Sequence, residues 1–188
     1  MFREQRDAVP LPFPVNLCYN AGMWNIIIRI GIEIAAALII ALLLRRFVCA
    51  LALVKGRSML DTLQDRELMF ALRYGLFGAP KRFDVVICRY PKRKGLFVKR
   101  IIGLPGETIS MEEDIVYING EAIEEDFPRR KCLRKIEERA LGDGEYFVMG
   151  DNRPSSTDSR RVGPLKREQI LYRAGYVVLP LKNRRKIR

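Results

Sequence analysis

The sequence predicts a mainly β protein in which an N-terminal transmembrane helix precedes an antiparallel β domain. Three observations favour this fold class. An uninterrupted apolar run lies at residues 26–44, short runs rich in Val, Ile, Phe and Tyr follow it, and an Asn-Gly pair separates two of those runs. With 188 residues, of which 48% are hydrophobic, the chain can bury a core and is not a disordered polycation.

The N-terminal part predicts an irregular segment followed by a membrane anchor. Residues 1–23 should be irregular, because three closely spaced prolines disfavour helix and central strand. As a helix, residues 26–44 would span roughly 28 Å at 1.5 Å per residue, close to the ~30 Å of bilayer hydrocarbon. Their two charges, Arg29 and Glu33, are spaced to pair on a helix. No small-x-small site precedes the arginine pair that follows, which favours an uncleaved anchor over a signal peptide.

The rest of the chain has the pattern of short antiparallel strands. Residues 83–90 and 95–103 are β-type runs, and Asn119-Gly120 predicts a hairpin with a type I′ turn. Further strands are expected within 142–152 and 173–180, whereas residues 129–140 fit either a short helix or a charged loop. The expected segments are therefore an irregular segment 1–23, an anchor 24–46, a catalytic β domain 47–180 and a basic tail 181–188.

The absence of histidine limits the chemistry that this chain can perform. It excludes Ser-His-Asp triads, Cys-His proteases and His-ligated metal sites. The four cysteines form no CxxC pair, so we expect no metal and no cofactor. A nucleophilic serine in this chain would need another base, for which lysine is the obvious choice.

The chain is strongly basic, and the charge is unevenly distributed. Of the formal net charge of +12, residues 160–188 carry +9, with ten basic residues and one acid. A solvated basic face is the simplest interpretation, and attraction to anionic lipid headgroups is a sharper one. Nucleic acid is not an expected partner, because no aromatic residue lies among the basic residues at 181–188.

Three segments together carry a recognisable pattern. Gly56-Arg57-Ser58-Met59 follows the anchor, Lys99 lies in the strand-like run 95–103, and Gly150-Asp151-Asn152-Arg153 precedes a serine-rich stretch. Taken singly, each fits an ordinary turn or a surface residue. In this order and spacing they resemble bacterial type I signal peptidases, membrane-anchored serine proteases with a Ser-Lys dyad, over roughly residues 26–165.

The resemblance implies a role for each matching residue. Ser58 would be the nucleophile and Lys99 the general base. Ser156 would orient that lysine, and Asp158 and Arg160 would brace the site. The oxyanion would be held by the backbone N–H of Ser58, with Gly56 as the second position, where some relatives carry a serine. The strands before Ser58 and Lys99 would flank the substrate groove, and its apolar lining would be Val54, Met59, Leu63, Phe97 and Val98.

One departure from the family pattern lies close to the expected nucleophile. The family proline three residues after that serine is Asp61 in this chain. This change should add a charge beside the site and loosen the turn.

The chemistry requires an unusual lysine. An ordinary lysine titrates near 10.4, and a value of roughly 7–8 makes it a competent base near neutral pH. Burial in an apolar site supplies such a shift. Strand alternation places Lys99 on the same face as Phe97 and Ile101, which is consistent with a buried amine.

The resemblance implies an activity and a location. The chain would hydrolyse exported preproteins after small-x-small sites, through an acyl-enzyme, and free their signal peptides. Alternatives are a specialised Ser-Lys peptidase of a conjugation or secretion system, and a non-catalytic relative in pilus assembly. The chain would cross the bacterial cytoplasmic membrane once, in contact with membrane lipid, with its catalytic domain outside. A count of flanking arginines suggests the reverse orientation, but long domains translocate despite such charges.

Overall fold

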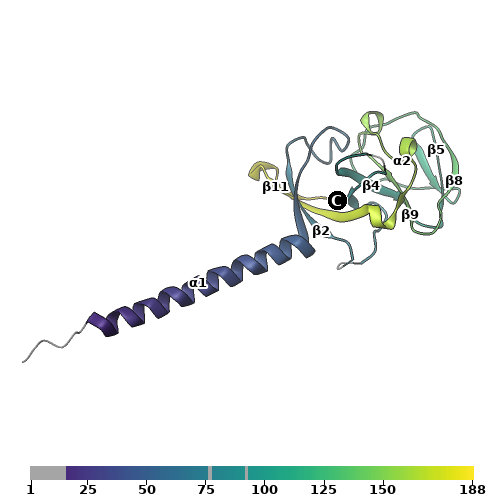
Figure 1. Cartoon of the computed structure of the whole chain (residues 1–188). Helices are drawn as coiled ribbons and strands as arrows, with labels where there is room; N and C mark the ends of the chain where they lie inside the picture. The colour runs from purple at the N-terminus through teal and green to yellow at the C-terminus, as the bar shows by residue number, and fades with distance from the viewer. Residues whose placement is uncertain (1–15, 76–77, 92) are drawn as a thin grey trace, which may run out of the picture. The chain divides into compact units, whose positions relative to one another are not determined.

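The computed structural model describes residues 16–188, except 76–77 and 92 (Figure 1). The chain divides into a unit that ends at Leu43 and a unit that spans Leu44–Arg188. Helix α1, Asn16–Phe47, contains the segment Gly22–Leu44, which is long and apolar enough to cross a membrane and has no buried residues. The prediction of an irregular segment is wrong for residues 16–23, because the prolines end before the helix begins; residues 1–15 lie outside the described part.

The second unit is built on a large antiparallel sheet. Its strand order is β1-β2-β11-β3-β4-β9-β10, with β12 paired to β11. The ten-residue strand β11 is central, because it pairs with β2, β3 and β12. The bounds are β1 Cys49–Leu53, β2 Leu68–Arg73, β3 Val85–Cys88, β4 Phe97–Gly103, β9 Glu145–Met149, β10 Leu165–Lys166, β11 Ile170–Leu179 and β12 Arg185–Lys186.

A smaller antiparallel sheet has the order β7-β6-β5-β8. The predicted hairpin is confirmed: Asn119 and Gly120 have φ of 52° and 82° and join β6 to β7. No helix forms at residues 129–140, since the second half becomes β8 by pairing with β5. The bounds are β5 Thr108–Glu112, β6 Ile115–Ile118, β7 Glu121–Ala122 and β8 Ile136–Ala140. Short helices are η1 Arg153–Ser155, α2 Ser159–Val162, η2 Arg167–Gln169 and η3 Leu181–Asn183.

Three apolar clusters form the core of this unit. The first lies under the segment that contains Ser58 and includes Val54, Met59 and Leu63. Strands β3 and β4 are buried on both faces for most of their length, so they lie at the centre of the packing. These strands therefore place Lys99 in the interior and not on the surface.

The C-terminal segment, residues 181–188, is part of this unit and not a free basic tail. Strand β12 pairs with β11, and Ile187 is buried in the first cluster. Arg185 forms an ion pair with Glu67, which is almost fully buried. The tail predicted at residues 181–188 is therefore held to the fold by strand pairing, by the buried side chain of Ile187 and by the Arg185–Glu67 ion pair.

Candidate active site

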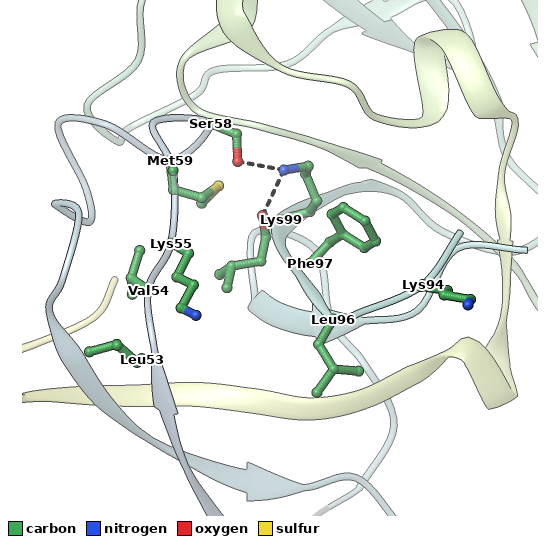
Figure 2. Close-up of a pocket in the computed structure, with 11 residues that line it drawn as sticks. Leu53, Val54, Lys55, Ser58, Met59, Lys94, Leu96, Phe97 and Lys99 are labelled. Atoms are coloured by element: carbon green, nitrogen blue, oxygen red, sulfur yellow. Dashed lines mark hydrogen bonds between the residues drawn. The ribbon is translucent and has the colours of Figure 1, made fainter. Parts of the chain in front are cut away.

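Ser58 and Lys99 meet at one end of the large sheet, although 41 positions separate them in sequence. The Nζ atom of Lys99 lies 2.6 Å from Ser58 Oγ, and it also donates to the carbonyl oxygen of Val98 at 2.9 Å (Figure 2). Lys99 is only 2% exposed because β4 runs through the interior. An amine with few partners thus contacts a half-buried hydroxyl.

Burial determines the charge state of this amine. Desolvation lowers the pKa of Lys99 below its ordinary value, against the opposing influence of Cys88, Asp158 and Asp151. Burial also raises the pKa of the Cys88 thiol to about 12, so the thiol stays neutral near neutral pH. The neutral form of Lys99 is therefore more populated near neutral pH than in an exposed lysine.

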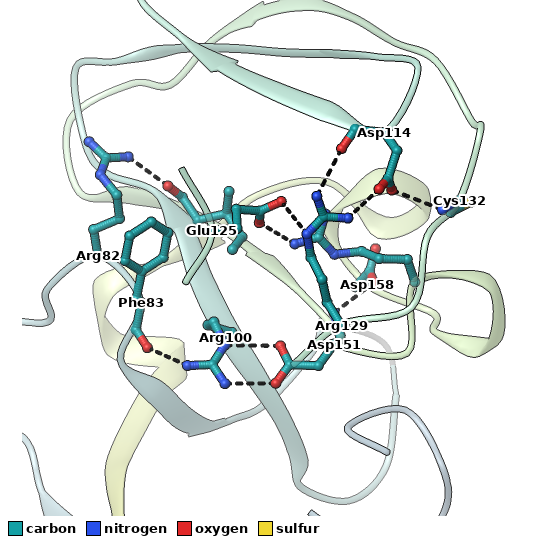
Figure 3. Close-up of polar contacts among 12 residues, drawn as sticks. Arg82, Phe83, Arg100, Asp114, Glu125, Arg129, Cys132, Asp151 and Asp158 are labelled. Atoms are coloured by element: carbon teal, nitrogen blue, oxygen red, sulfur yellow. Dashed lines mark hydrogen bonds and ion pairs between the residues drawn. The ribbon is translucent and has the colours of Figure 1, made fainter. Parts of the chain in front are cut away.

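Its neighbour Arg100 is buried as well, on the other face of β4. Its Nε and Nη2 atoms donate to the two carboxylate oxygens of Asp151 at 2.9 and 2.7 Å (Figure 3). A bidentate pair of this kind satisfies both buried charges. Asp151 also accepts a 2.5 Å hydrogen bond from Thr62 Oγ1, which links Arg100 to the segment that contains Ser58.

Residues 57–63, hereafter the Ser58 turn, are held by the segment that begins at Gly150. The backbone N–H of Asn152 donates to Ser58 O at 3.1 Å, and its side-chain amide donates to Arg57 O at 2.9 Å. Within the turn, Leu63 N–H donates to Met59 O at 2.7 Å. The Gly-Asp-Asn-Arg motif therefore supports the backbone of the expected nucleophile.

The three expected supporting residues lie next to this motif. Arg160 Nη2 and Asp158 Oδ2 are 2.8 Å apart and buried, and the N–H of Gly150 donates to Asp158 at 3.0 Å. Burial alone would raise the pKa of Asp158, but Arg160 and the N–H of Gly150 overcome that effect and lower it. Ser156 Oγ has no hydrogen-bond partner of good geometry among the described residues, so the structure does not join it to Lys99.

The two expected oxyanion positions differ in their availability. The N–H of Ser58 has no hydrogen-bond partner within the described part of the chain. The N–H of Gly56 donates to Asp65 Oδ1 at 2.8 Å, so it is not a free donor. Asp61 pairs with Arg130 at 2.9 Å, so the charge expected beside the site is paired and the turn gains a contact to residue 130.

A pocket of about 310 Å³ adjoins Ser58 and Lys99. Val54, Met59, Phe97 and Val98 line it, as predicted from the two flanking segments. Leu63 does not, because it is fully buried in the first core cluster. Four further residues line the pocket and were not predicted from the sequence: Leu53, Lys55, Lys94 and Leu96. Leu53, Lys55 and Leu96 are adjacent in sequence to predicted lining residues, which was the available signal for them, whereas no such signal pointed to Lys94.

Comparisons with known proteins agree with these motifs. The family model described as signal peptidase, peptidase S26, matches residues 27–179. Signal peptidase I T of Bacillus subtilis (strain 168) is 37% identical over 173 residues, covering 86% of this chain and 90% of that protein. A signal peptidase I of Bacillus amyloliquefaciens is 38% identical over 167 residues, covering 82% and 86%.

Among solved structures, a signal peptidase I from Enterococcus faecalis V583 is 34% identical, covers 50% of this chain and 94% of that chain, and aligns with a TM-score of 0.43. The family model begins at residue 27, so it includes most of the apolar segment Gly22–Leu44, and it extends to the end of β11. This chain belongs to the signal peptidase, peptidase S26, family.

Proposed function

We propose that this chain is a membrane-anchored endopeptidase that removes signal peptides from exported preproteins, with Ser58 as nucleophile and Lys99 as general base. The observation that carries the proposal is the contact of 2.6 Å between a buried lysine amine and a serine hydroxyl at the edge of a pocket. Burial keeps more of that amine neutral, which a base requires.

The reaction proceeds through two acyl transfers. Ser58 Oγ attacks the scissile carbonyl while Lys99 Nζ takes the hydroxyl proton, and the free N–H of Ser58 donates to the oxyanion. The C–N bond then breaks, and Lys99 returns the proton to the leaving amine. In the second half, Lys99 deprotonates a water molecule that attacks the ester, which releases the signal peptide and restores Ser58.

The remaining residues hold this centre in place. Asp158 and Arg160 fix the segment that starts at Gly150, and Ser156 in that segment would orient Lys99. The substrate would add as an extended strand between residues 53–56 and 96–98. Side chains at the first and third positions before the cut would enter the pocket, and membership of the signal peptidase family implies that both are small.

The location follows from the substrate. Signal peptides end at the outer surface of the cytoplasmic membrane, so the catalytic unit would lie on the extracytoplasmic side, with α1 spanning the lipid. Cys132 is partly exposed and offers a direct test. In a chain whose other cysteines are replaced, a membrane-impermeant maleimide added to intact cells should label Cys132; labelling only after lysis would place the unit inside.

Cleavage of a preprotein with an Ala-x-Ala site by the detergent-solubilised full chain tests the function. Ser58→Ala and Lys99→Ala should each abolish cleavage, whereas Ser155→Ala and Lys81→Ala, which change exposed residues, should not. Retained activity in both of the first variants would reject the dyad. Cleavage of several unrelated preproteins would separate a general signal peptidase from a specialised one, and the wide similarity to signal peptidases I does not favour a non-catalytic relative.

A further inference from the structure

The C-terminal segment contacts the Ser58 turn through one arginine. The Nη2 atom of Arg185 donates to the carbonyl oxygen of Thr62 at 2.6 Å. The same guanidinium binds both carboxylate oxygens of Glu67, at 2.8 and 2.9 Å. Asn183 adds a third hydrogen bond to Glu67, at 2.9 Å. The guanidinium of Arg185 thus connects the C-terminal segment to Thr62 in the Ser58 turn and to Glu67, which lies beyond the end of that turn.

Glu67 in turn closes the loop that contains Ser58. Its carbonyl oxygen accepts from Val54 N–H at 2.8 Å, and its carboxylate accepts from Gln64 N–H at 3.0 Å. The Glu67 side chain is only 1% exposed, so the carboxylate depends on these donors. Burial alone would raise the pKa of Glu67, but the pair with Arg185 and the two other donors lower it.

A short path leads from Arg185 to Ser58. Thr62 N–H donates to Met59 O at 3.1 Å, and Met59 directly follows Ser58. The turn also contains Asp61 at φ 82°, a conformation that a side-chain-bearing residue seldom adopts. Such a turn needs outside contacts to keep one geometry, and further contacts come from Asn152, Asp151 and Arg130.

We propose that Arg185 and Glu67 are positioning residues that clamp the Ser58 turn from the C-terminal segment, so that Ser58 Oγ stays within reach of Lys99. The inference rests on the proposed function, because it takes Ser58 as the nucleophile. It also gives part of the basic C-terminal segment a role inside the protein. Arg185 acts through Thr62 and Met59 and does not contact the substrate.

The test compares Arg185→Lys, Arg185→Gln and Glu67→Gln with Lys182→Gln, which changes an exposed residue of the same segment. A lysine can keep the charge pair with Glu67 but lacks the fork that also reaches Thr62 O. We expect Arg185→Lys to lower kcat about tenfold or more at unchanged KM, since small misplacements of reacting groups are costly. Arg185→Gln and Glu67→Gln should lose at least as much, and Lys182→Gln should match the parent.

Two further measurements separate positioning from loss of folded protein. Each kcat is normalised to the active sites titrated with a serine-reactive acylating probe, well below the unfolding midpoint of every variant. The acidic limb of the kcat–pH profile should keep its midpoint, because none of these changes touches Lys99. Parent-like kcat per active site in Arg185→Lys and Glu67→Gln, with only a lower unfolding midpoint, would overturn the clamp.

The clamp and the proposed function fail in different ways. Activity that survives Ser58→Ala would reject Ser58 as the nucleophile and with it the proposed mechanism, whatever the activity of the Arg185 variants. An inactive Ser58→Ala together with a fully active Arg185→Lys leaves the function standing and rejects the clamp alone. If Arg185→Gln does not fold, Arg185→Lys and Glu67→Gln still decide.

Discussion

A methyl group at Gly150 should disable the site while leaving the fold intact. A Cβ at this position would stand 2.5 Å from the carbonyl oxygen of Ser58 and 2.3 Å from Ser156 Oγ. Real Cβ contacts are almost never closer than 3.0 Å. Gly150→Ala therefore forces two expected site residues to move at once.

The displacement can be estimated from these distances. Ordinary contact begins at 3.4 Å, so Ser58 O must retreat by about 0.9 Å from its 2.5 Å position. The atom that must move is backbone, and it is already bound to Asn152 N–H at 3.1 Å, so it cannot swing aside as a side chain would. A misplacement of about 1 Å costs roughly a hundredfold in rate, and overpacking costs about 1–3 kcal/mol in stability.

Gly142, which precedes β9, and Gly103, in the neighbouring strand β4, provide matched controls for Gly150. Gly142→Ala meets nothing closer than 3.5 Å and should change neither activity nor stability. Gly103→Ala meets Leu141 at 2.7 Å, in the core cluster that also contains Ile109 and Phe147, so it should lower the unfolding midpoint and keep kcat. The assay is kcat for preprotein cleavage alongside thermal unfolding. A Gly150→Ala chain with kcat within twofold of the parent would show that the Ser58 turn tolerates the added Cβ and does not need this geometry.

Other changes have equally definite expected results. Lys99→Met should abolish cleavage and stabilise the fold. Because burial lowers the folded-state pKa of Lys99, this lysine binds more protons in the unfolded parent than in the folded parent up to about pH 10.4. The unfolding free energy of the parent, measured by urea titration, should therefore rise with pH relative to that of Lys99→Met by at most ~1.4 kcal/mol per unit, and an unchanged difference between the two would contradict the lowered pKa. Asp61→Pro should lower the unfolding midpoint, since proline cannot reach φ 82°, whereas Asp61→Asn should retain most of it; equal midpoints would contradict the turn geometry. Leu63→Ala should lower the unfolding free energy by about 2–5 kcal/mol without altering the preference for small residues at the cleavage site. Phe97→Ala should broaden that preference in a panel of substrates. A broadened preference in Leu63→Ala would show that Leu63 lines the pocket after all.

Local signals predicted the parts of the fold that depend on local chemistry. The Asn119-Gly120 turn requires positive φ at both positions, and Asn-Gly is the pair that best supplies it. Strands β8 and β12 escaped prediction because both are short and lie at sheet edges. They form by pairing with β5 and β11, and no local sequence preference in residues 136–140 or 185–186 indicates a strand.

The motifs implied that Ser58 and Lys99 lie together, and the structure contains that contact, but the motifs did not determine the surroundings of the two residues. Leu63 and Phe97 are both apolar residues near a motif, and only tertiary packing decides that one is core and the other faces the pocket. The Arg185–Glu67 pair joins positions 118 residues apart, and neither residue belongs to a motif. The basic residues at 181–188 suggested a surface function because composition does not show which charges find buried partners.

The most direct test of the central claim is to trap the acyl-enzyme. A preprotein with an Ala-x-Ala site is mixed with the full chain in detergent, quenched in acid, digested and examined by mass spectrometry. We expect an ester between the signal peptide carboxyl and Ser58, formed far more slowly in Lys99→Ala. Cleavage without a Ser58 adduct, or an adduct on another residue, would contradict it.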